Sequence, residues 1–484
     1  MIPDTRSRSV GNRVRRLPAG LAEARAIDVA ERFRDLPGLV VLESARPGRN
    51  ARWSYLTADP VAVLEAPASG HDPFATARRL LDRLDPTPAA DVQPPPFTGG
   101  LVGYLGYDLG RDLERLPSIA VDDQGLPPLR LALHDWVIAW DHRTGTAWLC
   151  GRAVDGDVRG LGRRLDDVHA RVLDPGLRAS DPRPVESEPD ALSFESSLDR
   201  AAYLDRVERI RGFIARGDIY QANLARRLAT PFDGDPWPLY RRLRTGDPSL
   251  FSAFLDLGPS PVTGHARALM SASPEPFLSA DPAGTVTSDP IKGTRPRGRT
   301  RDEDRALACE LLASVKDRAE NTMIVDVQRN DLGRVCRPGS IRVPRLCRLE
   351  RTAAVQHLVS TVTGRLAPGK DAFDLLRAAF PGGSITGAPK IRAMAVLEEL
   401  EPVRRGPYTG AVGWIGPDGA MQTAILIRTF VADGAALTLH VGGGITYRSD
   451  PAEEWNETVA KAAGPLGAIG ATEGSLRGGP TFAR

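Results

Sequence analysis

Lysine is scarce in this sequence. Five lysines occur among 63 basic residues: Lys292, Lys316, Lys370, Lys390 and Lys461. An arginine side chain cannot lose its proton in a protein, whereas a lysine amine can. We therefore expect some of the retained lysines to serve chemistry that needs an uncharged amine. Chance in an arginine-biased composition is the alternative for any single lysine.

Other absences exclude whole classes of protein. The four cysteines form no CxxC pair and no zinc-type spacing with histidine, which indicates a reducing compartment without structural zinc. No apolar run approaches the roughly 20 residues that span a bilayer. A formal charge of +2 provides no basic field for nucleic acid. The segment Met1 to Arg16 lacks the apolar core of a secretory signal, so we expect a frayed basic tail and a cytoplasmic protein, with no nucleic-acid or membrane partner.

The chain divides at a segment rich in proline, serine and acids. Residues 174–199 have little apolar periodicity and are typical of a linker. We expect an N-terminal part over residues 1–185 and a longer part over 195–475. In the first part, short β-like runs such as Trp136 to Trp140 alternate with a few helices, which favours an α+β class over a repeated βαβ pattern.

Two helix start signals lie in the second part. Thr300 to Glu303 resembles a capping box and predicts a helix that runs toward Glu320. Asp450 followed by Pro451 predicts a second helix that stops at Gly464.

These helices place acids one turn apart. Asp317 and Glu320 share one helix face, and Glu454, Glu457 and Lys461 share another. Such spacing most often marks a solvated face. If the two faces meet at one cavity, however, their carboxylates suit Mg²⁺, which prefers oxygen ligands and usually binds through one or two carboxylates.

Glycine-rich segments predict close approach of the backbone to a small anion. Residues 382–390 fail as a P-loop, because Ala388-Pro389 stands where Lys-Ser/Thr is required. Gly442, Gly443 and Gly444 lack dinucleotide-binding spacing, but their exposed N–H groups suit a carboxylate.

Two further polar residues lie on predicted strands. His357 alternates with apolar neighbours, and Arg428 follows an apolar run. Each has a plain structural alternative, a buried histidine and a surface arginine at a strand end.

Taken together, these segments resemble the chorismate-utilising enzymes, from about residue 39 to residue 465. The motifs that carry the resemblance are residues 217–224, 273–275, 290–298, 316–335, 380–390 and 442–461. Family members that add water to chorismate carry lysine where this chain has Gln221, and anthranilate synthases carry a small residue where it has Lys292. Pro290-Ile291-Lys292-Gly293-Thr294 is similar to the aminodeoxychorismate synthase branch.

The resemblance implies a fold and a reaction. The fold is α+β, with two large antiparallel sheets packed together, helices outside and two intertwined subdomains. The reaction is Mg²⁺-dependent amination of chorismate at C4 with ammonia, which gives 4-amino-4-deoxychorismate for p-aminobenzoate and folate synthesis. Lys292 would form a covalent adduct at C2, and Glu275 would protonate the departing C4 hydroxyl.

The resemblance also implies roles for other residues. Glu320 and Glu457 match metal-ligand positions, with Asp317 and Glu454 as supporting acids. Positions that line the substrate match a larger set: Gln221, Thr294, His357, Thr386, Tyr408, Arg428, Gly442, Gly443, Gly444 and Lys461. Glu43 and Ser44 match part of a tryptophan pocket, and the sequence leaves open whether tryptophan binds there.

A partner subunit is also expected. The sequence has no Gly-x-Cys-Leu-Gly nucleophile motif of a glutamine amidotransferase, so ammonia would come from a separate glutaminase subunit. Two alternatives remain: an anthranilate synthase component I, which Lys292 disfavours, and a noncatalytic tryptophan- or chorismate-binding regulator, which Glu275, Glu320 and Glu457 disfavour.

Overall fold

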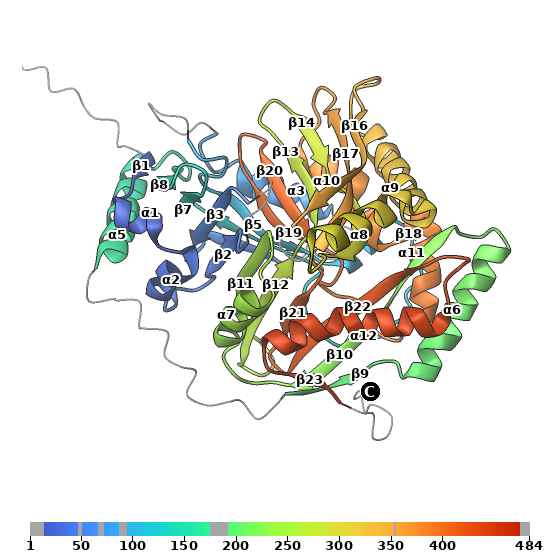
Figure 1. Cartoon of the computed structure of the whole chain (residues 1–484). Coiled ribbons are helices and arrows are strands. Elements are labelled where there is room, and N and C mark those ends of the chain that lie inside the picture. Colours follow the sequence, from blue (N-terminus) through green and yellow to red (C-terminus); the bar gives the residue numbers. More distant parts are fainter. Residues whose placement is uncertain are drawn as a thin grey trace, which may run out of the picture.

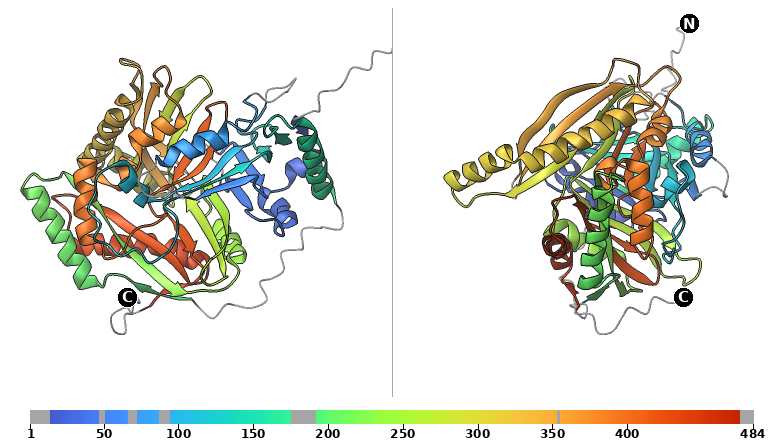
Figure 2. Two further views of the ribbon diagram at one scale, coloured as in Figure 1. Left: turned by 180° about the vertical axis from the view of Figure 1, so that it is seen from behind. Right: turned by 90° about the vertical axis from the view of Figure 1, so that its right-hand side faces the viewer.

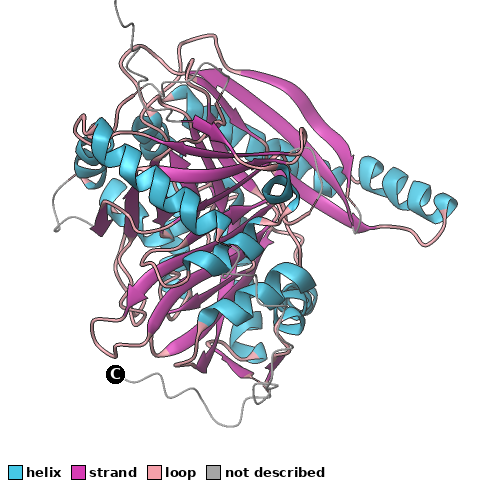
Figure 3. Ribbon diagram, turned by 90° about the vertical axis from the view of Figure 1, so that its left-hand side faces the viewer, coloured by secondary structure: helices cyan, strands magenta, loops and turns pink. Residues whose placement is uncertain are grey.

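The computed structural model describes residues 14–46, 51–65, 72–86, 94–174, 192–352 and 355–474. These residues form two large, mostly antiparallel sheets that pack together, with helices outside (Figures 1 and 3). Between the sheets, Val40 and Tyr55 of one sheet belong to the same buried cluster as Val102 and Trp414 of the other. The predicted α+β class and its two antiparallel sheets are therefore confirmed.

The larger sheet has 13 strands in the described part of the chain. Their order is β1 (Val14–Arg16), β8 (Thr146–Gly151), β7 (Trp136–Asp141), β3 (Trp53–Thr57), β2 (Val40–Glu43), β11 (Phe251–Pro259), β12 (Ala266–Ser273), β21 (Thr429–Ala432), β22 (Ala436–Ile445), β10 (Gln221–Pro231), β9 (Ser193–Ser196) and β23 (Thr472–Glu473), with β18 (Gly387–Ala388) beside β10.

The smaller sheet has ten strands in the same described ranges. Their order is β15 (Ile291–Pro296), β17 (Val355–Arg365), β14 (Thr285–Ser288), β13 (Pro276–Ala280), β20 (Met421–Ile425), β19 (Ala411–Ile415), β5 (Gly100–Leu105), β6 (Leu129–His134) and β4 (Ala62–Glu65), with β16 (Arg342–Arg351) beside β17.

Each sheet combines strands from the two predicted parts, 1–185 and 195–475. In the larger sheet β2 pairs with β11, and in the smaller sheet β5 pairs with β19. Residues 175–191 of the predicted linker lie outside the described residues, but Ser193–Ser196 within its predicted range form β9. The predicted basic tail is also wrong at its end, because Val14–Arg16 pair with β8; residues 1–13 lie outside the described ranges.

Helices cover the outer faces of both sheets. Their bounds are α1 (Ala19–Glu23), α2 (Ala26–Ala30), α3 (Pro73–Leu81), α4 (Gly110–Leu113), α5 (Val158–Leu173), α6 (Arg200–Ala215), α7 (Pro236–Gly246), α8 (Arg301–Ala313), α9 (Val315–Gly333), α10 (Ala372–Ala379), α11 (Lys390–Leu400) and α12 (Pro451–Ala468). Figure 1 shows α12 lying across β22 and β10, and the rear view in Figure 2 shows α11 (orange) beside α6 (green).

Two helix predictions need correction. The helix that begins after Thr300 does not continue to Glu320, because it ends at Ala313 and α9 begins at Val315. Ser314 ends the first helix and caps the second, where its hydroxyl accepts the backbone N–H of Asp317 at 3.2 Å.

The second correction concerns α12, which passes the predicted stop at Gly464 and includes Pro465. Ala462 and Leu466 of this helix are buried in a core cluster with residues of the larger sheet. This packing stabilises the helix past Gly464 and Pro465, which have low helix propensity.

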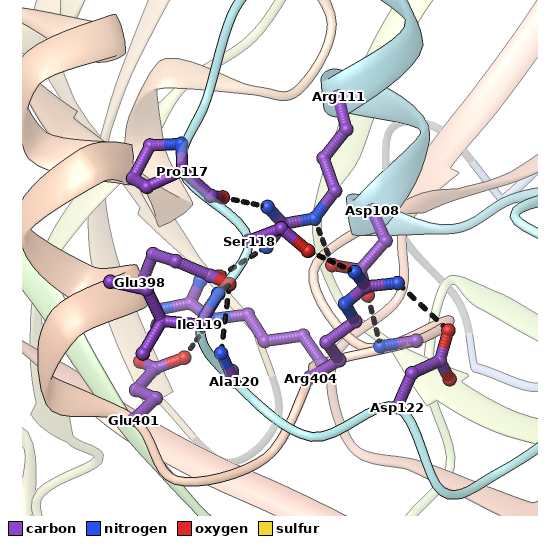
Figure 4. Close-up of polar contacts among 12 residues, drawn as sticks. Asp108, Arg111, Pro117, Ser118, Ile119, Ala120, Asp122, Glu398, Glu401 and Arg404 are labelled. Atoms are coloured by element: carbon purple, nitrogen blue, oxygen red, sulfur yellow. Dashed lines mark hydrogen bonds and ion pairs between the residues drawn. The ribbon is translucent and has the colours of Figure 1, made fainter.

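A polar cluster attaches the segment after α4 to α11 and to the loop that follows it (Figure 4). The carboxylate of Glu398 accepts the backbone N–H groups of Ile119 at 2.7 Å and Ala120 at 2.9 Å. Arg404 donates to Asp122 at 2.8 Å. These contacts join residues far apart in the sequence and support the wall of the molecule that carries α11.

In the described ranges, none of the helices has both the length and the apolar character needed to cross a bilayer.

Candidate functional site

A cavity of about 630 Å³ brings together most of the residues predicted for the site. The predicted residues that line it are Glu275, Lys292, Thr294, Asp317, Glu320, His357, Tyr408, Arg428, Gly442, Gly444, Glu454, Glu457 and Lys461. They come from both sheets and from α9 and α12, so the cavity exists only in the folded chain.

Lys292 and Glu275 are joined through one residue, Ser384. The Nζ atom of Lys292 donates to the backbone carbonyl of Ser384 at 3.1 Å, and the hydroxyl of Ser384 donates to Oε1 of Glu275 at 2.8 Å. Ser384 lies in the short 3₁₀ turn η3 (Gly383–Ile385). Ser384 thereby holds the amine of Lys292 and the carboxyl group of Glu275 near each other at the cavity wall.

A β-bulge shapes the strand that carries Lys292. The pairing of β15 with β17 shifts register between Lys292 and Thr294, and Gly293 between them has a φ of +79°. A Cβ at Gly293 would lie 2.9 Å from Cβ of Asp317, so both the backbone angle and the neighbouring helix require glycine. The bulge places Lys292 and Thr294 in the same cavity wall.

Glu275 has the properties of a proton donor. Loss of hydration around its carboxyl group raises its pKa, and this effect outweighs the charge of Lys292, the hydrogen bond from Ser384 and the charge of Lys461. The residue is partly exposed and lines the cavity. A carboxyl group with a raised pKa retains its proton closer to neutral pH and can give it to a leaving group.

The strand β17, which pairs with β15, contributes a neutral histidine to the cavity. His357 shares a hydrogen bond of 2.9 Å between Nδ1 and the hydroxyl of Thr294. Burial, reinforced by the charges of Arg46 and Arg428, lowers the pKa of His357 to about 4, so the ring is uncharged at neutral pH.

Arg428 already has an anionic partner within the protein. Its guanidinium lies 3.0 Å from a carboxylate oxygen of Asp247. The residue has a φ of +50° in the connection between β20 and β21, so the predicted strand ends three residues earlier, at Ile425. A substrate carboxylate at Arg428 would share this cation with Asp247.

Carboxylates from two helices converge on the cavity. Asp317 and Glu320 project from the start of α9, and Glu454 and Glu457 project from α12. Burial and the neighbouring charges of Asp317 and Glu457 raise the pKa of Glu320, although Lys292 and Lys316 oppose this shift. Glu320 on α9 and Glu457 on α12 line the same cavity, so the two helix faces meet there.

The four acids differ in their protein partners. Asp317 is paired with Arg295 at 3.1 Å, and Glu457 is paired with Lys461 at 2.6 Å. Burial opposes ionisation of Glu457, but the charge and hydrogen bond of Lys461, together with the charges of Lys292 and Lys316, outweigh it and lower the pKa of this carboxyl. Glu454 has a pKa raised by burial and by Glu457, and its buried Oε2 atom has no hydrogen-bond partner.

These acids fit a weakly held divalent cation. In the described part of the chain no group of three or more histidine, cysteine, aspartate or glutamate side chains forms a ready metal cage. Mg²⁺ needs no such cage, because it keeps several waters and binds through one or two carboxylates together with substrate oxygens. The unpartnered Oε2 of Glu454, in a cavity that Glu320 and Glu457 also line, is the observation that favours a cation here.

The glycine triplet serves packing as well as access. A Cβ at Gly442 would lie 2.4 Å from the carbonyl of Leu224, and one at Gly444 would lie 2.3 Å from Nε2 of Gln221. Gly443 lies against the acids, since a Cβ there would be 3.1 Å from Oε2 of Glu454. Close pairing of β22 with β10 therefore requires Gly442 independently of any ligand, whereas a side chain at Gly444 would displace the side chain of Gln221.

Several predicted residues lie outside the cavity lining. Gln221, Thr386 and Gly443 are not among the lining residues. Gln221 is buried behind Gly444, and the hydroxyl of Thr386 donates to the carbonyl of Gly382 at 3.0 Å. These three residues lie behind the residues that line the cavity and do not form its surface.

Glu43 and Ser44 line a separate cavity of about 60 Å³. The carboxylate of Glu43 is paired with Arg244 at 2.7 Å and accepts the hydroxyl of Tyr240 at 2.8 Å. The Ser44 hydroxyl lies 3.2 Å from the carbonyl of Leu250. The acid is thus satisfied by the protein itself.

The sequence analysis missed Ser384 and His440. His440 stacks on Tyr408 with 5.0 Å between ring centroids, and burial raises the pKa of Tyr408 and lowers that of His440, so this wall is aromatic and uncharged. Ser384 lies within the motif at residues 380–390, but only a three-dimensional contact with Glu275 gives it a role. His440 has no sequence signal apart from its place two residues before the glycine triplet.

Comparison with known proteins agrees with this geometry. A family model of the chorismate binding enzyme matches residues 40–467. Anthranilate synthase component 1 of Streptomyces coelicolor is 41% identical over 435 residues, which cover 87% of this chain and 81% of that protein. Aminodeoxychorismate synthase component 1 of Salmonella typhimurium is 40% identical over 425 residues, which cover 85% of this chain and 88% of that protein.

A solved structure gives the same result. The structure of anthranilate synthase component I from Streptococcus pneumoniae superposes with a TM-score of 0.75 at 30% identity, covering 87% of this chain and 93% of that one. With a family match over most of the chain and relatives at about 40% identity, the chain belongs to the chorismate-binding enzyme family.

Proposed function

We propose that this protein aminates chorismate at C4 with ammonia and forms 4-amino-4-deoxychorismate. The observation that carries the proposal is the position of Lys292. Its side chain lines the cavity, and Lys292 and the proposed proton donor Glu275 are both hydrogen-bonded to Ser384. A nucleophile and an acid that act on opposite ends of one diene system need this proximity.

The first step would use both groups. The amine of Lys292 first loses its proton to solvent, and its lone pair then bonds to C2 of chorismate. The two double bonds of the ring shift, and the bond between C4 and its hydroxyl breaks. Glu275 gives its proton to the departing hydroxyl, which leaves as water.

The second step would reverse the electron shift. Ammonia bonds to C4 and gives up a proton, the double bonds return to their first positions, and the bond between C2 and the Lys292 nitrogen breaks. Lys292 departs as a neutral amine, and the proton that the new C4 ammonium group gives up returns to the carboxylate of Glu275. The overall reaction therefore exchanges ammonia for water and retains the diene. Occupation of C2 by the lysine directs ammonia to C4.

The cavity also provides binding groups for the two carboxylates of chorismate. Glu320 and Glu457, with Asp317 and Glu454 in support, would hold a magnesium ion. The ion, when bound, would hold the ring carboxylate and withdraw electrons from C2. Neutral His357 and the backbone near Gly442 would contact the substrate without adding negative charge.

Ammonia would come from a second subunit. The relatives are named component 1 of their enzymes, and the sequence lacks a glutaminase nucleophile motif. The purified chain should therefore turn over chorismate with ammonium and Mg²⁺ but not with glutamine. Turnover driven by glutamine alone would contradict this part of the proposal.

Anthranilate synthesis is the second candidate, and one observation favours it. The anthranilate synthase component of Streptomyces coelicolor is as similar to this chain as the aminodeoxychorismate synthase component of Salmonella typhimurium. In that reaction ammonia bonds at C2 and pyruvate is lost. Lys292 in the cavity argues against it, because its amine would occupy the position that ammonia must reach.

The deciding experiment is identification of the product. The chain is incubated with chorismate, Mg²⁺ and ammonium, and the products are separated by chromatography and identified by mass spectrometry. We expect 4-amino-4-deoxychorismate. Anthranilate as the main product would overturn the proposal, and the absence of any product would favour a noncatalytic regulator.

A further inference from the structure

The turn that carries Ser384 is held from several sides. The guanidinium of Arg405 donates to the carbonyl of Ile385 at 3.0 Å, and Arg405 is itself buried and paired with Glu401 at 2.7 Å. A Cβ at Gly383 would lie 2.6 Å from a methyl carbon of Val327 on α9, so the turn is packed directly against that helix. A group carried by this turn has little freedom to move.

Ser384 uses this fixed position to contact two groups at once. Its side chain donates to Glu275 and its backbone carbonyl accepts from Lys292. One contact uses the side chain and the other uses the backbone. A substitution of the side chain therefore removes the hydrogen bond to Glu275 and retains the one from Lys292. Ser384 is also buried, so the surrounding packing restricts its side chain.

Resting on the proposed function, we propose that Ser384 is a positioning residue that aims the acidic oxygen of Glu275 at the leaving hydroxyl and holds it in register with the amine of Lys292. Without the hydroxyl of Ser384, the Glu275 carboxyl would be free to rotate within the cavity. A hydrogen bond to a charged group is worth enough to change a rate by roughly tenfold to a hundredfold.

The charged groups around Glu275 define the expected pH effect. Lys292 on β15 and Lys461 on α12 act on Glu275 through their charges, and Ser384 acts through its hydrogen bond. The serine favours the ionised carboxylate, so its removal raises the pKa of Glu275 further. Since the protonated form is the acid, activity should then persist to higher pH, even though the rate at the plateau is lower.

The test compares Ser384→Ala with Ser288→Ala. Ser288 is a buried serine on β14 whose hydroxyl donates to the carbonyl of Phe277 at 2.9 Å, and it does not line the cavity. We expect Ser384→Ala to lower kcat about tenfold to a hundredfold, to change KM for chorismate less than threefold, and to move the alkaline limb of the kcat profile upward. Ser288→Ala should do none of these.

A double-mutant cycle separates positioning from general structural damage. If Ser384 acts through Glu275, Ser384→Ala should cause no further loss in the Glu275→Gln background, measured by single turnovers. Ser384→Cys retains most of the side-chain volume but has a weaker hydrogen-bond donor, so its kcat should lie between those of the wild type and Ser384→Ala. This variant provides the test if the alanine variant folds poorly.

Two results would overturn the inference: wild-type kcat in Ser384→Ala, or an undiminished loss from Ser384→Ala in the Glu275→Gln background together with an unmoved pH profile. Every assay also identifies the product. If the product is anthranilate, the proposed function fails, but the hydroxyl at C4 still departs, and the cycle still tests Ser384.

Discussion

The cavity around Glu275 and the smaller one at Glu43 both contain buried acids, but the acids differ in their hydrogen-bond and ion-pair partners. At the smaller cavity, Glu43 receives hydrogen bonds from Arg244 and Tyr240. At the larger one, Oε2 of Glu454 has no partner, and burial raises the pKa of Glu275, Glu320 and Glu454. The protein satisfies Glu43 fully, whereas Glu454 in the larger cavity keeps one oxygen without a hydrogen-bond partner.

This difference separates stability from function. A buried carboxylate that is fully paired contributes to holding the fold, and the loss of one partner exposes the other as an isolated charge. Carboxyl groups with raised pKa values are held at a cost, which is typical of groups that act on a substrate or a cation. Substitutions in the two cavities should therefore produce opposite patterns of stability and activity.

The largest effect is expected from Glu275→Gln. Glutamine retains the shape of the side chain but cannot give a proton, so kcat should fall about 100-fold to 10,000-fold while the melting temperature stays near that of the wild type. Exposed Glu399→Gln on α11 is the matched control and should leave kcat unchanged. Steady-state kinetics with chorismate and ammonium measure both, and a Glu275→Gln variant with wild-type kcat would remove the acid assignment.

The next largest effect is expected from Glu457→Gln. If this carboxylate binds Mg²⁺, the concentration of Mg²⁺ at half-maximal activity should rise at least tenfold, since loss of even an outer contact can weaken metal binding by that factor. Isothermal titration calorimetry with Mg²⁺ gives a second readout that does not depend on turnover. Glu453→Gln, exposed on the same helix, is the control. An unchanged titration of Glu457→Gln would exclude the residue as a ligand.

Glu43→Gln should show the reverse pattern. Loss of the carboxylate leaves the Arg244 guanidinium buried without its ion-pair partner, so the free energy of unfolding should fall by about 3 kcal/mol. Activity per folded molecule should stay near wild type at low temperature. Chemical denaturation and kinetics on the same preparation test this, and a stable variant with lost activity would place Glu43 in the functional site.

The smallest effect is expected from Glu454→Gln in the presence of a chelator. Because the folded protein raises the pKa of Glu454, it favours the protonated form, and ionisation at higher pH costs stability. Neutral glutamine avoids that cost, so the variant should melt roughly 1–2 °C above wild type at pH 8. The gain should shrink as pH falls through the raised pKa. Calorimetric scans at several pH values check the sign, and a lower melting temperature at pH 8 would contradict it.

From the sequence, the residues of the larger cavity could be predicted better than their arrangement in space. Lysine scarcity pointed to Lys292, helical spacing placed each pair of acids on one helix face, and the resemblance to the chorismate-utilising enzymes added Glu275. Local patterns also gave the strand at His357 and the capped start of α12. No pattern could show that α9 and α12 face each other, because that depends on how two sheets pack.

The errors have a common physical cause. Ser314 lies in a segment without proline or glycine, so nothing in the pattern marks a helix end there, yet its hydroxyl caps the next helix. Gly464 and Pro465 are typical of a helix end, yet burial of Leu466 outweighs their unfavourable propensity. Ser384 was missed because its role lies in contacts with residues about 90 and 110 positions away. Tertiary packing decides each of these.

The most direct test of the central claim is the partition of nitrogen between C4 and C2 in Lys292→Ala. The variant is incubated with chorismate, Mg²⁺ and ammonium, and wild-type protein quenched during turnover is digested and analysed by mass spectrometry. We predict an adduct on the wild-type Lys292 peptide, a sharp loss of 4-amino-4-deoxychorismate in the variant, and the appearance of some C2-aminated product or anthranilate. Formation of the C4-aminated product by Lys292→Ala at the wild-type rate would contradict the covalent mechanism.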